Sequence, residues 1–185
     1  MLAVRGLGDV MEIITHDGGE LAGKLTALFK LAQEIRGPFL EQAIFVEKLI
    51  EDIIAQHFCP DEGRRDLFLS LVINGTDLTF SNKIAIFERL LRLCHGQLLE
   101  KYGDLVDEIH KIRKFRNRTA HAMLDSSEEF LRRGFDDRIQ LIFQEDGRKK
   151  RQVITVTERN ERLAACSKVV MALSDIQQLI LGANV

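Results

Sequence analysis

Apolar residues recur at every third or fourth position over most of the chain, which is the period of a helix face turned toward a core. In the first two such segments the expected inward positions are Leu21, Leu25, Leu28, Ala32 and Ile35, then Phe39, Ala43, Val46, Ile50 and Ile53. Gly37-Pro38 lies between them and predicts a stop or a kink. Three more apolar residues widen the second face: Ile44, Ile54 and Phe58. We therefore expect the second helix, 39–58, in the middle of a bundle.

Turn signals divide the next part of the chain into shorter helices. After a break at 59–63, helices are expected over 65–73, from a cap at Thr79 or Ser81 to Gly96, over 97–102, over 104–124 and over 128–133. The expected core face of the second of these is Ile84, Phe87, Leu91 and Cys94. Asp104 is a good N-cap for the fourth, and Gly134 stops the last.

The period changes to two after Phe135. Ile139, Leu141 and Phe143 alternate with polar residues, as in a half-buried strand, and 153–157 is β-branched and could pair back on it. Asp146-Gly147 would turn a hairpin over about 138–157, with a loop too long or irregular for a clean two-residue turn. A final helix follows, with inward positions at Leu163, Cys166, Val170, Leu173, Ile176 and Ile180.

These patterns predict a mainly α fold, an antiparallel helical bundle with a small C-terminal β-hairpin followed by a final helix. Residues 1–19 contain four glycines and indicate a flexible arm, and 20–185 form a single helical domain. Three scattered cysteines indicate buried thiols in a reducing compartment. No signal peptide and no stretch near 18 uncharged apolar residues is found, so we expect a cytoplasmic protein with no membrane partner.

Positive charge is concentrated in one window, residues 110–121. The window holds two His, no acid and five basic side chains: Lys111, Arg113, Lys114, Arg116 and Arg118. Because the chain is formally −2, the rest of it carries −7. This concentration indicates a phosphate-bearing partner, whereas the near-neutral total argues against a general nucleic-acid coat protein.

The same window interrupts an apolar helix face. The expected seam is Leu105, Ile109, Ile112, Arg116, Thr119 and Met123. Arg116 stands where a Leu or Ile belongs, and a guanidinium is costly to desolvate without a partner. A polar line follows at the same spacing: His110, Lys114, Asn117 and His121. Asn117 lies one turn before His121 and can orient it.

The segment Arg116-Asn117-Arg118-Thr119-Ala120-His121 is an R-x4-H hexapeptide. It resembles the defining motif of HEPN domains. Upstream, Phe80-Ser81-Asn82-Lys83-Ile84 and then Ile112-Arg113-Lys114-Phe115-Arg116-Asn117 look like the F-x-x-K-I and I-R-K-x-R-N segments of the HEPN group related to mannitol-operon repressors. The likeness covers roughly 40–124, so it leaves out the hairpin and the last helix.

The resemblance implies a helical bundle that dimerises and joins two R-x4-H motifs in one cleft. Active members of the family are metal-independent endoribonucleases, which leans the prediction toward an enzyme of toxin, defence or stress type. Arg116, His121 and Asn117 are then the catalytic candidates. A His can take the proton of a ribose 2′-OH, and an Arg can hold phosphate oxygens in the transition state. The RNA-binding candidates are Lys111, Arg113, Lys114 and Arg118.

Two alternatives stay open at this point. The first is a non-catalytic regulator that acts through protein contacts, as in the mannitol-repressor group, with an antitoxin or regulatory protein as a possible partner. The second is a structural role, in which Arg116 pairs with a buried acid such as Glu47, or Asp52, and His121 only caps a carbonyl. An enzyme requires Arg116 and His121 to be accessible, whereas the structural role requires Arg116 to be buried against a carboxylate.

Other features favour ordinary roles. The basic run 148–151 at the hairpin tip could grip a nucleic-acid backbone, but a solvated turn is the preferred interpretation. His16, His57 and His95 show neither ligand spacing nor a partner. Because no metal-binding or phosphate-loop motif occurs, we expect no metal site and no cofactor.

Overall fold

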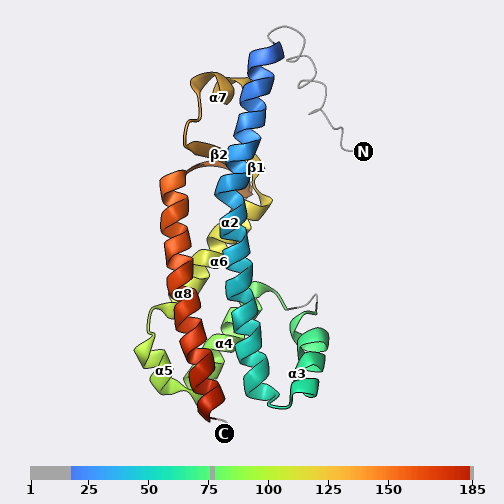
Figure 1. The fold of residues 1–185 in the computed structure, drawn as a ribbon, viewed down its shortest axis with the longest axis vertical. Coiled ribbons are helices and arrows are strands. Elements are labelled where there is room, and N and C mark those ends of the chain that lie inside the picture. Colours follow the sequence, from blue (N-terminus) through green and yellow to red (C-terminus); the bar gives the residue numbers. More distant parts are fainter. Residues whose placement is uncertain (1–17, 76–77, 184–185) are drawn as a thin grey trace. The chain divides into compact units, whose positions relative to one another are not determined.

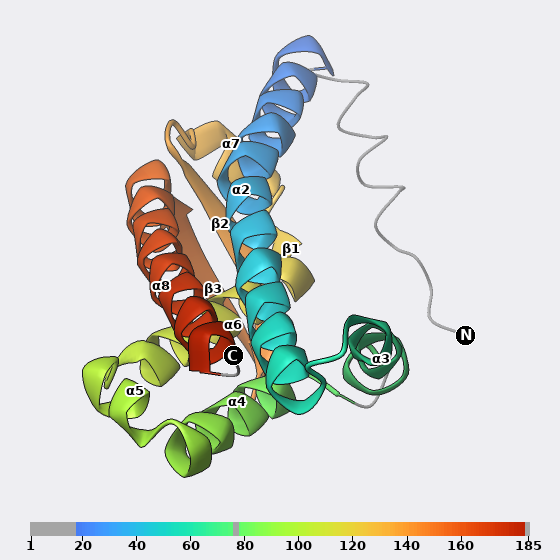
Figure 2. The same cartoon turned by 60° about the horizontal axis from the view of Figure 1, so that its bottom comes forward.

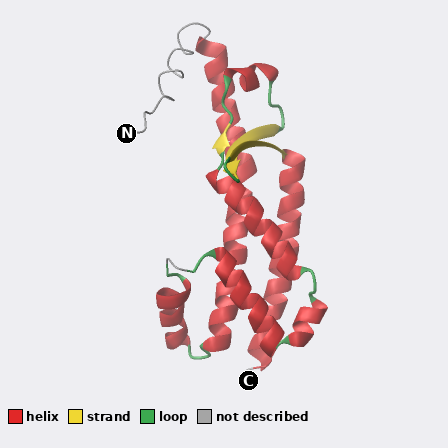
Figure 3. Cartoon of the chain, turned by 180° about the vertical axis from the view of Figure 1, so that it is seen from behind, coloured by secondary structure: helices red, strands yellow, loops and turns green. Residues whose placement is uncertain are grey.

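The computed structural model describes residues 18–75 and 78–183, so the predicted arm lies almost entirely outside the described residues (Figure 1). The described chain is mostly helical, with a three-stranded antiparallel sheet and a C-terminal helix (Figure 3). The elements are α2 (Gly18–Phe58), α3 (Glu62–Phe68), the π-helix η1 (Leu69–Ile73), α4 (Phe80–Cys94), α5 (Gly96–Lys101), α6 (Leu105–His121), β1 (Met123–Leu124), α7 (Glu128–Arg133), β2 (Arg138–Glu145), β3 (Arg148–Thr155) and α8 (Val156–Ala183).

The described residues divide into two compact units. The sheet unit comprises 18–37 and 121–159, and the helical unit comprises 38–75, 78–120 and 160–183. The sheet unit holds the start of α2, α7 and the three strands. The helical unit holds the rest of α2 with α3, η1, α4, α5, most of α6 and most of α8 (Figure 2).

α2 does not stop at Pro38 but runs unbroken for 41 residues. A proline within a helix has no N–H for the carbonyl four residues earlier, here that of Glu34. Arg159 supplies the missing donor, because its Nη1 lies 3.0 Å from the Glu34 carbonyl oxygen. The expected stop was therefore wrong, since a residue 125 positions away satisfies the exposed backbone group.

The sheet has the order β1-β2-β3, with both pairs antiparallel. Asp146 and Gly147 alone join β2 to β3, at φ 53° and 71°. Two positive φ values are the mark of a type I′ turn, so the predicted long or irregular loop was wrong. The predicted helix through Leu124 was also wrong, because Met123 and Leu124 leave the helix to pair with Ile142 and Leu141.

One face of the sheet is buried, through Ile139, Leu141 and Ile154. The segment that follows β1 is held to the sheet by polar contacts. Asp125 is buried and accepts hydrogen bonds from the Gln140 side chain at 2.8 Å and from the Ser127 N–H at 3.1 Å. α7 covers the predicted 128–133 and is capped by Ser127.

The core of the helical unit follows the predicted seams in most places. All five inward positions of 39–58 are buried, as are Ile84, Phe87 and Leu91 on α4. Thr79, and not Ser81, caps α4 by accepting a hydrogen bond from the Asn82 N–H. Of the residues expected to widen the face of 39–58, Ile54 is buried, whereas Ile44 and Phe58 are exposed, as is Cys94 on α4.

On α8, four of the predicted inward positions are buried: Cys166, Leu173, Ile176 and Ile180. The other two, Leu163 and Val170, are half-buried, and Val169 is buried instead of Val170. Among the described residues α8 is the one helix whose length and composition would suit a membrane span, a test that core helices of soluble proteins also pass.

Candidate functional site

α6 carries the whole R-N-x-x-A-H segment. Leu105, Ile109 and Ile112 are buried as predicted, and so is Thr119. Phe115 is buried as well, with its ring 4.6 Å from the ring of Phe39 on α2 and 4.6 Å from the Arg162 guanidinium on α8. These two contacts fix the turn of α6 that presents Arg116 within the helical unit.

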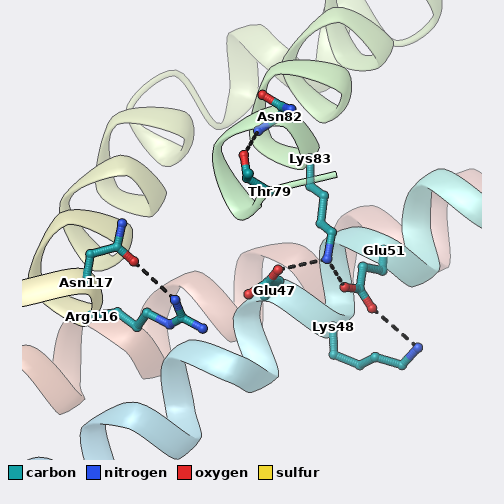
Figure 4. A network of polar contacts seen from close by, with 8 residues as sticks. All are labelled: Glu47, Lys48, Glu51, Thr79, Asn82, Lys83, Arg116 and Asn117. Carbon is teal, nitrogen blue, oxygen red and sulfur yellow. Dashed lines mark hydrogen bonds and ion pairs between the residues drawn. The ribbon is translucent and has the colours of Figure 1, made fainter. Parts of the chain in front are cut away.

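Arg116 is half-buried and has no acidic partner among the described residues. Its Nη1 donates a hydrogen bond to the amide oxygen of Asn117 at 3.1 Å, as Figure 4 shows. A neutral amide orients a guanidinium without cancelling its charge. The Arg116 side chain is therefore held in place, and its charge remains available to an anion.

The carboxylates that could have neutralised Arg116 are bound elsewhere. Lys83 on α4 is buried and donates from Nζ to Glu47 at 2.8 Å and to Glu51 at 2.6 Å (Figure 4). Asp52 pairs with Lys48 at 3.1 Å. The interpretation of Arg116 as the structural partner of Glu47 or Asp52 is therefore wrong.

Lys83 stays charged because of its two acids. Burial alone would lower the pKa of Lys83, but the hydrogen bonds and negative charges of Glu47 and Glu51 outweigh it and raise that pKa above its usual value. Sequence reasoning quoted Lys83 only within a motif and missed Glu51. The available signal was a Lys at an inward position of α4 facing acids one turn apart on α2.

The predicted RNA-binding residues fall into two groups. Lys111, Lys114 and Arg118 are exposed and spaced three and four apart, so they share one face of α6. Arg113 is half-buried, one turn from Arg116, and its Nε is buried with no hydrogen-bond partner in the described chain. Lys111 also pairs with Glu108 at 2.6 Å, and this hydrogen bond raises the pKa of Lys111.

His121 is the last residue of α6, exposed, and followed by buried Ala122 and then β1. Five residues of α-helix turn through roughly 140° beyond a full turn, so Arg116 and His121 occupy different faces of α6. One copy of the motif does not place base and cation on one helix face.

A second polar pair was not expected from the sequence. His95 Nε2 lies 3.4 Å from His57 Nδ1, across 38 residues of chain. Burial, and next the nearby His57, lower the pKa of His95. The treatment of both histidines as unpartnered was wrong, because the ends of α2 and α4 bring them together.

The remaining chemistry of the described residues is sparse. No group of three or more His, Cys, Asp or Glu side chains in 18–75 and 78–183 is placed to hold a metal. A cavity of about 650 Å³ lies in the helical unit, between the α5–α6 turn at Tyr102 and the Ala164–Ala172 face of α8. It does not include Arg116. Comparisons of the chain with models of protein families, with curated proteins and with solved structures found no match.

Proposed function

We propose that this chain is an RNA-targeting protein of HEPN type that cleaves RNA without a metal, through Arg116, Asn117 and His121. The observation that carries the proposal is the state of Arg116. Its guanidinium is oriented by Asn117 and unpaired with any described acid, while the acids of α2 are engaged by Lys83 and Lys48. A cation left unneutralised at an inward helix position lowers stability, and a bound phosphate would offset this loss by pairing with the guanidinium.

The reaction is an internal transesterification. His121 removes the proton of a ribose 2′-OH, and the 2′-oxygen attacks the neighbouring phosphorus while the bond to the 5′-oxygen breaks. Arg116 holds the non-bridging oxygens as their charge grows. The products are a 2′,3′-cyclic phosphate and a 5′-OH end, and the leaving oxygen needs a proton from an acid.

One motif supplies a base and a cation but no separate acid. In a homodimer, His121 of a second copy would supply that proton. The family resemblance adds the expected setting, which is a cytoplasmic toxin, defence or stress protein with an antitoxin or regulatory partner. The proposed chemistry requires no cofactor.

The test is cleavage of RNA by the purified protein in the presence of EDTA. Wild type is compared with His121→Ala and Arg116→Ala, and product ends are identified. We expect cyclic phosphate ends from wild type and loss of cleavage in both variants. Inert wild type, or variants that cut equally well, would overturn the nuclease.

A second candidate function is a non-catalytic regulator, and one observation favours it. α3 has no buried residue, and in η1, which follows it, Ile73 is the buried residue. Leu67, Leu71 and Val72 are exposed, Leu71 to 75%. Large apolar side chains gathered on a surface mark protein contacts.

If the protein is a non-catalytic regulator, Leu71→Ser should abolish its regulatory activity in cells, while RNA cleavage by the purified protein is nil or unchanged. Arg116→Ala would then leave the cellular activity intact. The nuclease predicts the reverse dependence on these two residues.

A further inference from the structure

The sheet unit has an exposed face whose composition only the strand register defines. Side chains alternate across a strand, so residues paired in register share a face. Opposite the buried face lie the pairs Arg138 with Thr155, Gln140 with Val153, Ile142 with Arg151, and Gln144 with Lys149. We call these residues, together with Met123 of β1 opposite Ile142, the open sheet face.

The open sheet face contains three cations and no acid. Arg138, Lys149 and Arg151 are all exposed, and no member of the face is buried. Its acidic neighbour is Asp125, a buried residue that accepts a hydrogen bond from Gln140 at 2.8 Å and forms an ion pair with Arg151, with 3.9 Å between Oδ2 and Nε. The two hairpin acids lie elsewhere: Glu145 points to the other face and pairs with Lys150, and Asp146 is in the turn.

The open sheet face also carries apolar side chains, which lie between its cations. Met123 is 72% exposed and Val153 46%, with Ile142 half-buried between them. An antiparallel sheet commonly packs one face on the core and turns a polar face to water. A face that combines exposed apolar side chains with cations of one sign fits a ligand with apolar surface and regular negative charge, as a single RNA strand has.

The face is also close to the proposed catalytic base. His121 precedes Met123 by two residues, so their Cα atoms are at most about 7 Å apart. Both belong to the sheet unit. A strand bound along the open sheet face would therefore pass His121.

We propose that the open sheet face is the surface that binds the phosphate backbone of single-stranded RNA, through Arg138, Lys149 and Arg151. This inference rests on the proposed function and assigns its substrate surface. It revises the interpretation of 148–151 as a solvated turn, because these residues form an edge strand that sends Lys149 and Arg151 to one face and Arg148 and Lys150 to the other.

The alternation provides a matched control within one strand. Lys149→Gln/Arg151→Gln removes one Lys and one Arg from the open sheet face, and Arg148→Gln/Lys150→Gln removes the same charges from the opposite face. The probe is a fluorescein-labelled, fully 2′-O-methylated 20-nucleotide single strand, which has no 2′-OH nucleophile. Binding is followed by fluorescence anisotropy at several salt concentrations, and thermal melting verifies that each variant folds.

We expect Lys149→Gln/Arg151→Gln to weaken binding by at least about tenfold near 0.1 M salt and to reduce the slope of log K against log salt by about 1.4, for two lost contacts. Arg148→Gln/Lys150→Gln should bind nearly as wild type. Equal losses in both variants would show a net-charge effect and overturn the assignment. So would unchanged binding in both, or a wild-type protein that does not bind the strand.

Cleavage of the unmodified strand separates this inference from the proposed function. If binding needs the open sheet face but wild type never cuts, the surface assignment stands and the nuclease falls. If wild type cuts through Arg116 and His121 while Lys149→Gln/Arg151→Gln binds and cuts normally, the nuclease stands and the surface assignment falls.

Discussion

Lys83 and Arg116 are both cations at inward positions of amphipathic helices in the helical unit, yet their surroundings differ. Lys83 is buried between Glu47 and Glu51, so its charge is matched inside the protein. Arg116 is half-buried and bonded to a neutral amide. A matched buried cation indicates a structural role, whereas an oriented and unmatched one indicates a binding role. This difference is the reason for proposing that Arg116, and not Lys83, contacts the ligand.

The largest expected effect is on RNA cleavage, which should depend on Arg116 but not on Lys83. Arg116→Met should reduce RNA cleavage by roughly 10²- to 10³-fold, the usual loss when one donor to transition-state charge is removed. Lys83→Met should retain activity per folded molecule, because Lys83 is engaged by two acids. Single-turnover cleavage, corrected for the folded fraction by circular dichroism, measures both. A comparable loss in Lys83→Met would break the distinction.

The free energy of unfolding should change in the opposite order, with the larger loss in Lys83→Met and the smaller in Arg116→Met. Lys83→Met leaves Glu47, whose side chain is 17% exposed, without its cation, and Glu51, 8% exposed, with only Lys48 at 3.6 Å. It should cost about 3 kcal/mol of unfolding free energy. Arg116→Met removes an unmatched charge and should cost less than about 1 kcal/mol. Urea unfolding measures these changes.

Glu51→Gln supplies the control for that experiment. Added to Lys83→Met, it should recover part of the lost stability, because it removes one of the two carboxylate charges that Lys83 had neutralised. The structural role of Lys83 is wrong if the single variant is as stable as wild type.

A subtler substitution tests whether Arg116 acts through shape or through charge. Arg116→Lys keeps the positive charge but loses the planar fork that binds two phosphate oxygens. Loss of one charge-assisted hydrogen bond, about 1.5 kcal/mol, should lower kcat/KM by about tenfold. Full activity in Arg116→Lys would show that a point charge suffices.

The smallest expected effect is a change in the free energy of unfolding at alkaline pH. Because the folded protein raises the pKa of Lys83, the folded state holds that proton when the unfolded chain has lost it. The contribution is complete below the ordinary lysine pKa of about 10.4 and is lost as pH rises through the higher folded value. The difference in unfolding free energy between wild type and Lys83→Met should shrink only above that pH. For Arg116→Met no such change is expected, since a guanidinium does not titrate there.

Much of the fold was predictable because it depends on local periods. The helical face of 39–53, the helix at 128–133, the strand alternation at Ile139 and Leu141 and the final helix are all confirmed. The failures involve contacts between distant residues. Pro38 does not end α2, where Arg159 satisfies the freed carbonyl, and Ile44 and Phe58 are exposed although they extend the apolar face.

The candidate site was predictable only in its residue types. The sequence marked Arg116, Asn117 and His121 as unusual, and left open whether Glu47 neutralises Arg116. That question depends on which helix faces Glu47, and the structure answers it with Lys83 of α4. Sequence reasoning did not identify the open sheet face, since a shift of one residue in the β2–β3 register would exchange Lys149 for Lys150.

By itself the sequence determined the helical character of the chain, the hairpin and the concentration of charge in 110–121, because period and composition are local properties. Only the tertiary structure decided how charges are paired. It matched Lys83 with two acids, left Arg116 with an amide, and turned Lys149 and Arg151 to one exposed face. Pairing depends on distances between residues far apart in the chain, and only packing sets those distances.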